Sequence, residues 1–213
     1  MFDHFLKYAQ PPTTEAIMRK FVLTRKESFG VLLELQTARH LLLLLGTQRI
    51  LMAFPFSSIA TPFKVRVGKT QYFANCAWDA VAFHVMLKRD TLIESYCHHC
   101  AEAIRIRLSG QKVASTIPRS PQVYIALPAA RWWDNILNTC SNNMTFFSSA
   151  THFQDWKLDN LESIGEKLTI DQTIRLSVPT YSDKMKMGYT RPSREQFVSH
   201  FESIGLVGDF WKI

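Results

Sequence analysis

The sequence predicts an α+β fold, with a helical N-terminal segment followed by a core of antiparallel strands with helices. Apolar residues recur at helical spacing up to about residue 40, whereas later stretches alternate between apolar and polar residues as strands do. Pro and Ser residues between 55 and 62 separate the two patterns. We therefore expect a winged-helix-like N-terminal domain over residues 1–62, a core over 63–176 and a C-terminal extension over 177–213.

The N-terminal segment has the order of elements of a winged-helix module. Residues 2–21 have two amphipathic stretches, separated by the proline pair 11–12, which a helix would not cross. Thr24, with Glu27 three residues later, has the pattern of a capping box that opens a further helix. Two apolar runs around a glycine-containing turn then predict a β-hairpin over residues 41–54.

The core alternates between predicted strands and helices. Strands are expected at 64–67, 91–95, 104–108, 123–127 and 146–147. The segment from Tyr72 begins extended and should become a helix near Cys76, because apolar residues then recur at helical spacing. Further helices are expected at 150–158 and 164–176, and one amphipathic piece lies near Phe201.

The composition is that of a protein with a packed core. Of its 213 residues 46% are hydrophobic and 20% are charged, and four cysteines are too few for a disulfide scaffold. The longest apolar stretch, 41–45, is too short to span a membrane, and no signal peptide is visible. We expect a cytoplasmic protein without a membrane partner. The net charge of +7 is spread along the chain without a dense stripe, so we expect no nucleic-acid partner.

Two of the four cysteines have neighbours that suggest chemistry. Thiolates bind soft metals strongly, and two of them on one Hg(II) ion would weaken its bond to an organic group. If the segment after Cys76 is helical, Asp79 shares its face and can pass a proton to the departing carbon. Cys140 is the candidate second thiol. Three tryptophans are candidate walls of the substrate pocket: Trp78, Trp132 and Trp133.

At these residues the chain resembles the alkylmercury (organomercurial) lyase family. Several separated motifs carry the resemblance over roughly residues 40–175: Pro55-Phe56-Ser57, Asn75-Cys76-Ala77-Trp78-Asp79, Ser95-Tyr96-Cys97, Leu127-Pro128, Thr139-Cys140, Phe146-Phe147-Ser148 and Trp156. The resemblance implies an alkylmercury-lyase-like core and protonolytic cleavage of carbon–mercury bonds. It assigns mercury binding to Cys76 and Cys140, and metal binding and proton transfer to Asp79.

The resemblance also implies which partners the protein meets. The substrate would be a small organomercurial, no organic cofactor would be needed, and Hg(II) would be bound as substrate and product. A low-molecular-weight thiol or a mercuric reductase would accept the released ion. The spacing from Cys140 to Phe146 is one residue longer than the usual pattern of the family, so either Cys140 is displaced or a local bulge absorbs the extra residue.

Two other functions remain open from the residues. The chain could be a non-lytic relative that binds a soft metal or performs thiol chemistry on the same scaffold. It could also be a winged-helix metal-responsive regulator that binds DNA through a helix over 24–39, with Arg25, Gln36 and Arg39 among its contacts.

The motif Cys97-His98-His99-Cys100 allows several hypotheses. It could be half of a zinc site, but no second CxxC or histidine pair follows at finger spacing. In the resembling family, Cys97 takes the position of a packing cysteine, and a secondary role in passing metal is a further alternative.

Overall fold

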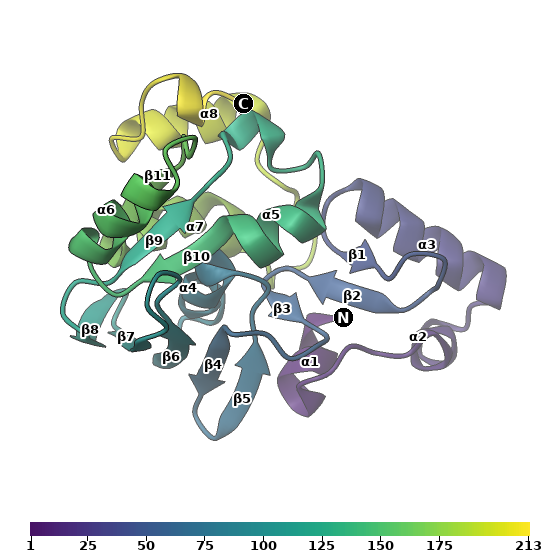
Figure 1. The fold of residues 1–213 in the computed structure, drawn as a ribbon. Coiled ribbons are helices and arrows are strands. Elements are labelled where there is room, and N and C mark those ends of the chain that lie inside the picture. Colours follow the sequence, from purple (N-terminus) through teal and green to yellow (C-terminus); the bar gives the residue numbers. More distant parts are fainter.

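A computed structural model describes residues 1–213 and confirms the α+β class (Figure 1). Its α-helices are α1 (Phe2–Tyr8), α2 (Thr14–Phe21), α3 (Arg25–Thr37), α4 (Ala77–Leu87), α5 (Ile136–Asn143), α6 (Ala150–Asp159), α7 (Ile170–Tyr181) and α8 (Arg194–Ser203). Short 3₁₀ turns lie at Ala129–Arg131 and Asp209–Trp211. None of the helices is both long enough and apolar enough to cross a membrane.

The strands form three antiparallel sheets. The first has the order β1 (Leu42–Leu43), β2 (Ile50–Ala53), β3 (Phe56–Ser57). The second has the order β5 (Thr70–Phe73), β4 (Lys64–Val67), β6 (Thr91–Tyr96), β7 (Ala103–Ser109), β8 (Lys112–Ile117). The third has the order β10 (Met144–Phe147), β9 (Gln122–Ile125), β11 (Glu166–Thr169).

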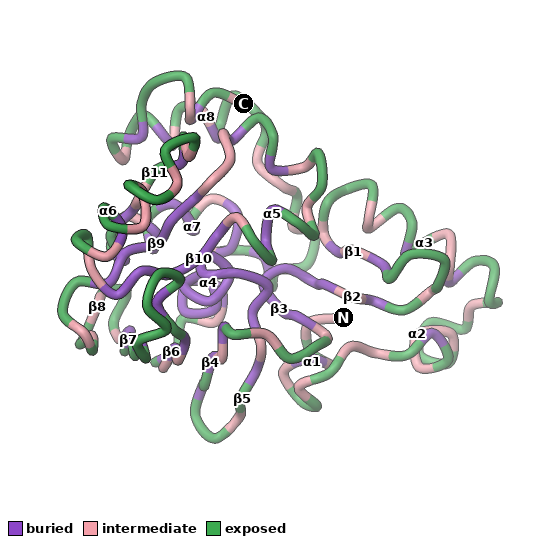
Figure 2. Tube along the Cα trace, viewed as in Figure 1, coloured by how far each residue is buried: buried purple, intermediate pink, exposed green.

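Helix α4 lies at the centre of the molecule (Figure 2). Ten of its residues, Ala77 to Met86, are buried, because the sequence is apolar on every side of the helix. It packs against α7 and touches strands of the second and third sheets. A helix that is apolar on every side must be enclosed by the protein. The residue at its N-cap, Cys76, is therefore buried as well.

The N-terminal segment contains the predicted helices and hairpin. Thr24 and Glu27 form the expected capping box at the start of α3. Helix α1 joins this segment to the core. The Tyr72 hydroxyl donates a hydrogen bond of 3.0 Å to the Leu6 carbonyl. Phe5 stacks on Phe56, whose ring centroid lies 4.6 Å from that of Phe83 in α4. The winged-helix interpretation stays a prediction.

Two of the side chains expected to reach DNA have partners within the protein. Arg25 pairs with Glu15 at 3.0 Å, and the side-chain oxygen of Gln36 accepts a hydrogen bond of 2.8 Å from the backbone N–H of Leu43.

The sequence missed four elements: β3, β8, β11 and α5. The helix expected over 164–176 begins only at Ile170, because Thr169 and Gln172 form a capping box there. Residues 166–169 instead extend and pair with β9. Helix α7 then continues to Tyr181, so the expected limit at 176 falls inside a helix.

Candidate active site

Cys76 occupies the N-cap of α4. Its backbone is still extended, and the helix begins at the next residue. Its sulfur accepts a hydrogen bond of 3.3 Å from the backbone N–H of Asp79. A helix leaves its first N–H groups without backbone partners, so a side chain at the N-cap is held facing the residue three positions later. The cap therefore fixes the thiol beside the carboxyl group of Asp79.

Cys140 reaches the same place from α5, a helix that begins after the cap residue Asn135. The sulfur atoms of Cys76 and Cys140 and a carboxylate oxygen of Asp79 all lie within 4.8 Å of one another, and all three residues are buried. The extra residue before Phe146 causes no displacement of Cys140 from this group. Strand β10 follows α5 directly and pairs with β9 without a bulge.

The carboxyl group of Asp79 is held from two sides. Asn75 donates a hydrogen bond of 2.9 Å to one oxygen, and the hydroxyl of Tyr181 donates one of 2.5 Å to the other. Asn75 is itself fixed by a bond of 3.1 Å to the carbonyl of Pro55. Both oxygens are thereby oriented, and neither can turn to solvent because Asp79 is only 2% exposed.

Burial raises the pKa of all three groups and so favours their protonated forms. Loss of solvent raises the pKa of Asp79 to about 6, although hydrogen bonds from Tyr181 and Asn75 oppose the shift. Burial also raises the pKa of the Cys76 thiol well above its ordinary value, and the neighbouring Cys140 and Asp79 add to this. For Cys140 a hydrogen bond with Cys76 lowers the pKa, but burial and the charge of Asp79 outweigh it. Near neutral pH the metal-free site thus holds two thiols.

The three groups open into a small cavity of about 30 Å³. The three predicted tryptophans line it, together with Phe54, Ile136, Met144, Thr180, Tyr181 and Arg191. Trp78 and Trp132 pack with ring centroids 5.1 Å apart, and each ring N–H has a partner: Ser177 Oγ for Trp78 and the Leu127 carbonyl for Trp132. The walls are thus rigid and mainly apolar, which favours an apolar ligand over water.

Several residues of the site could not be found from the sequence. Tyr181 and Thr180 lie in the segment expected to be an extension, as do the cations Lys184 and Arg191. Lys184 is 3% exposed and its Nζ lies 4.8 Å from the centroid of the Tyr181 ring. Burial lowers the pKa of Lys184 to about 7, with Arg191 adding to the effect and Asp79 opposing it. No motif marks these residues, because their partners are distant in the sequence.

The segments that follow α3 and precede α8 meet at Trp133, just before α5. The guanidinium carbon of Arg191 lies 4.7 Å from the centroid of the Trp133 ring, and that of Arg39 lies 5.0 Å from it. These cation–π contacts hold the half-buried indole at the edge of the cavity. Arg39, expected as a DNA contact, thus packs against the cavity wall instead.

A buried pair of thiols beside a carboxyl group defines the chain as a candidate soft-metal protein of the thiolate class. Comparison with known proteins gives the family. Residues 56–182 match the family described as alkylmercury lyase (MerB), so the chain belongs to the alkylmercury lyase family, and the expected resemblance is confirmed.

Individual relatives agree with this assignment. The chain is 29% identical over 119 residues to an alkylmercury lyase of Staphylococcus epidermidis, covering 56% of this chain and 54% of that protein. It is 31% identical over 118 residues to an alkylmercury lyase of Bacillus cereus, covering 55% and 52% respectively. The chain therefore matches only about half the length of these curated relatives.

A solved structure shares the fold. The crystal structure of the mercury-bound form of MerB2 superposes with a TM-score of 0.66 over 80% of this chain and 81% of that one, at 23% sequence identity. The similarity therefore extends beyond the region of sequence similarity to most of the fold.

Proposed function

We propose that the protein is an organomercurial lyase that cleaves carbon–mercury bonds by protonolysis at Cys76, Cys140 and Asp79. The observation that carries the proposal is the meeting of two thiols and a carboxyl group within 4.8 Å, from segments far apart in the sequence. Tryptophan walls around these groups suit the organic part of the substrate.

The reaction balances with the groups present. An organomercurial R–Hg–X exchanges X⁻ for the sulfur of one cysteine, whose proton passes to Asp79 or to solvent. The second thiol forms another Hg–S bond and gives up its proton, so that Asp79 receives one of the two thiol protons and solvent the other. The Hg–C bond then breaks, and the electron pair of that bond takes the proton from Asp79 to give R–H. The overall products are R–H, H⁺, X⁻ and Hg(II) held by two thiolates. No oxidant, reductant or organic cofactor is required.

Asp79 is suited to carry the proton in this scheme. Its pKa of about 6 allows the group to take a proton from a thiol and release it to carbon near neutral pH. Its position beside the Cys76 sulfur, fixed by the helix cap, keeps both transfers short. A small thiol or a mercuric reductase would then remove Hg(II), since thiolates exchange a soft metal among themselves.

The proposal is tested by following hydrocarbon release from phenylmercury acetate in the presence of excess thiol. We expect benzene from the wild-type protein, and none above background from Cys76→Ala, Cys140→Ala or Asp79→Asn. Ser141→Ala is the matched control, because Ser141 is an exposed neighbour of Cys140 on α5, and it should retain wild-type turnover. Normal turnover by Cys76→Ala would refute the assignment.

The same experiment separates the lyase from a non-lytic relative. If the wild-type protein binds one equivalent of Hg(II) at Cys76 and Cys140 but releases no benzene from phenylmercury acetate, it is a soft-metal binding protein.

A further inference from the structure

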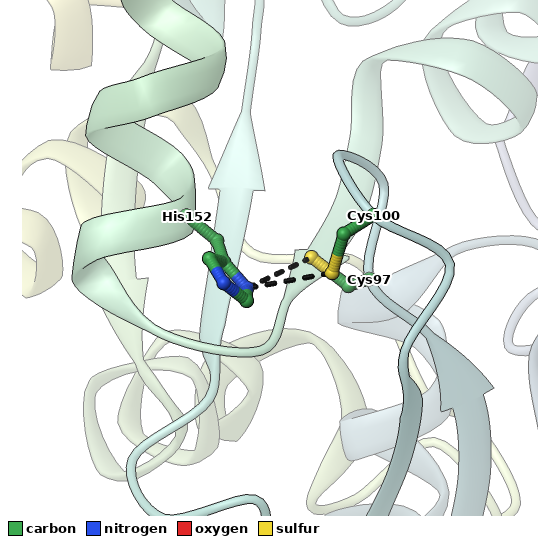
Figure 3. Close-up of side chains that lie close together, drawn as sticks. All are labelled: Cys97, Cys100 and His152. Carbon is green, nitrogen blue, oxygen red and sulfur yellow. Dashed lines mark hydrogen bonds between the residues drawn. The ribbon is translucent and has the colours of Figure 1, made fainter.

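A second group of metal-ligating side chains lies outside the cavity (Figure 3). Cys97 directly follows β6, Cys100 lies three residues later in the turn, and His152 belongs to the first turns of α6. The two sulfur atoms and a ring nitrogen of His152 all lie within 4.8 Å of one another. The sequence showed the cysteine pair, but nothing in it pointed to the histidine 52 residues beyond Cys100.

Backbone hydrogen bonds hold the pieces of this group in place. The turn is closed by bonds from Cys97 N–H to the Glu102 carbonyl at 2.8 Å and from Ala101 N–H to the Cys97 carbonyl at 2.9 Å. Ser149 caps α6 by accepting a bond of 3.1 Å from the backbone N–H of His152. The ligand atoms are therefore presented by ordered backbone before any ion arrives.

The distances fit a tetrahedral ion. His152 Nδ1 lies 3.4 Å from Cys100 Sγ and 3.9 Å from Cys97 Sγ (Figure 3). Metal–sulfur bonds of about 2.3 Å and metal–nitrogen bonds of about 2.0 Å at tetrahedral angles place S and N about 3.5 Å apart. We propose that Cys97, Cys100 and His152 form a second metal site, distinct from the catalytic thiols, which binds a divalent ion of the zinc class.

A fourth ligand is also within reach. Glu102 Oε2 lies 3.9 Å from His152 Nδ1, and the Glu102 side chain is 47% exposed, so a short rotation or a bound water would complete the coordination. Cys100 is exposed and His152 partly so, in contrast to the enclosed catalytic thiols. Ions can therefore enter this second site directly from solvent.

Metal binding would replace an existing contact. Ser148 Oγ lies 2.5 Å from His152 Nδ1, so an ion on this nitrogen displaces the hydroxyl. Ser148 directly follows β10, and the first residue of that strand, Met144, touches the Cys76 sulfur at 3.8 Å. Four residues of strand span about 13 Å, so the two sites are separate but lie along one strand.

The test is a cobalt(II) titration of the full-length, reduced protein under anaerobic conditions, which keeps Cys97 and Cys100 from joining as a disulfide. Cobalt(II) replaces zinc in tetrahedral thiolate sites and gives strong visible bands there. The Cys140→Ser variant should still bind one equivalent of cobalt(II), with the visible bands of a tetrahedral, thiolate-bound ion. His152→Ala and Cys100→Ser should each weaken that binding by more than the roughly 10–100-fold that loss of an outer partner costs.

A matched control is available in the same turn. The ring of His99 lies beside that of His152, with centroids 5.8 Å apart, but offers no atom to the group, so His99→Ala should bind cobalt like the wild-type protein. Absence of binding by the reduced wild-type protein would overturn the proposal, as would thiolate-bound cobalt that survives both His152→Ala and Cys100→Ser when each is combined with Cys140→Ser, which disables the first thiol pair. Loss in His99→Ala with retention in His152→Ala would also overturn it. Because no organomercurial is used, the result is independent of the lyase assay.

Discussion

Asp79 combines its proposed role in chemistry with a cost in stability. Its carboxyl group is buried and its hydrogen bonds from Asn75 and Tyr181 do not fully compensate for the lost solvent. The pKa accordingly rises from 3.8 to about 6. A proton bound more tightly in the folded state contributes stability that is present below the unfolded pKa and is lost as the pH rises through the folded one. The folded protein should therefore lose stability between about pH 4 and pH 6.

Asp79→Asn should reverse this loss while abolishing activity. The raised pKa of Asp79 corresponds to about 3 kcal/mol lost from the free energy of unfolding above pH 6. A neutral amide does not carry this cost, although it weakens the hydrogen bond with Asn75, so the net gain is smaller. We expect the variant to be more stable than the wild-type protein at pH 8 and similar to it at pH 4. Urea denaturation at both pH values measures the difference. Parallel pH dependences in the two proteins would contradict the burial argument.

At the scale of the element, α4 uses the thiol that we propose to be catalytic as its cap. Cys76 accepts the Asp79 N–H at 3.3 Å, a bond that serine would make better and alanine cannot make. Cys76→Ser should therefore keep the stability of the wild-type protein, whereas Cys76→Ala should lose about 1 kcal/mol. Both should be inactive, because neither side chain binds a soft metal. Denaturation curves and benzene release separate the two effects, and equal stability of the two variants would argue against the cap.

The elements also explain which parts of the site were predictable. Cys76 and Asp79 are three residues apart, so helical periodicity alone placed them on one face. Helix α5 was missed because its sequence, rich in Asn, Ser and Thr, has low helix propensity and depends on the cap at Asn135 and on packing. Tyr181 was missed because Pro179 and nearby polar residues resemble a boundary, although the packing of α7 on α4 carries the helix past them.

At the scale of the whole molecule, the C-terminal segment belongs to the core. Phe197, Phe201 and Trp211 are buried in the same hydrophobic cluster as Cys76 and Cys140. The Phe201 ring lies 5.6 Å from that of Trp211 and 6.1 Å from that of Trp132. The aromatic contacts thus connect the last helix to a wall of the cavity.

Phe201→Ala should consequently destabilise the whole protein by about 3–5 kcal/mol, because a fully buried ring leaves a cavity. Val207→Ala is the matched control, since Val207 is 68% exposed in the same segment and its truncation should change stability by less than about 0.5 kcal/mol. Thermal unfolding of both variants gives the comparison. A mild effect of Phe201→Ala would indicate that the segment folds independently of the core.

The distance along the chain between Asp79 and Tyr181, 102 residues, has a consequence during synthesis. At about 5–20 residues per second, the ribosome adds the tyrosine roughly 5–20 s after the aspartate. Throughout that interval the nascent polypeptide carries Cys76 and Asp79 without the tyrosine that binds the carboxyl group in the folded protein. We therefore expect the thiol to become shielded from thiophilic ions in the surrounding fluid only after residue 181 has been added.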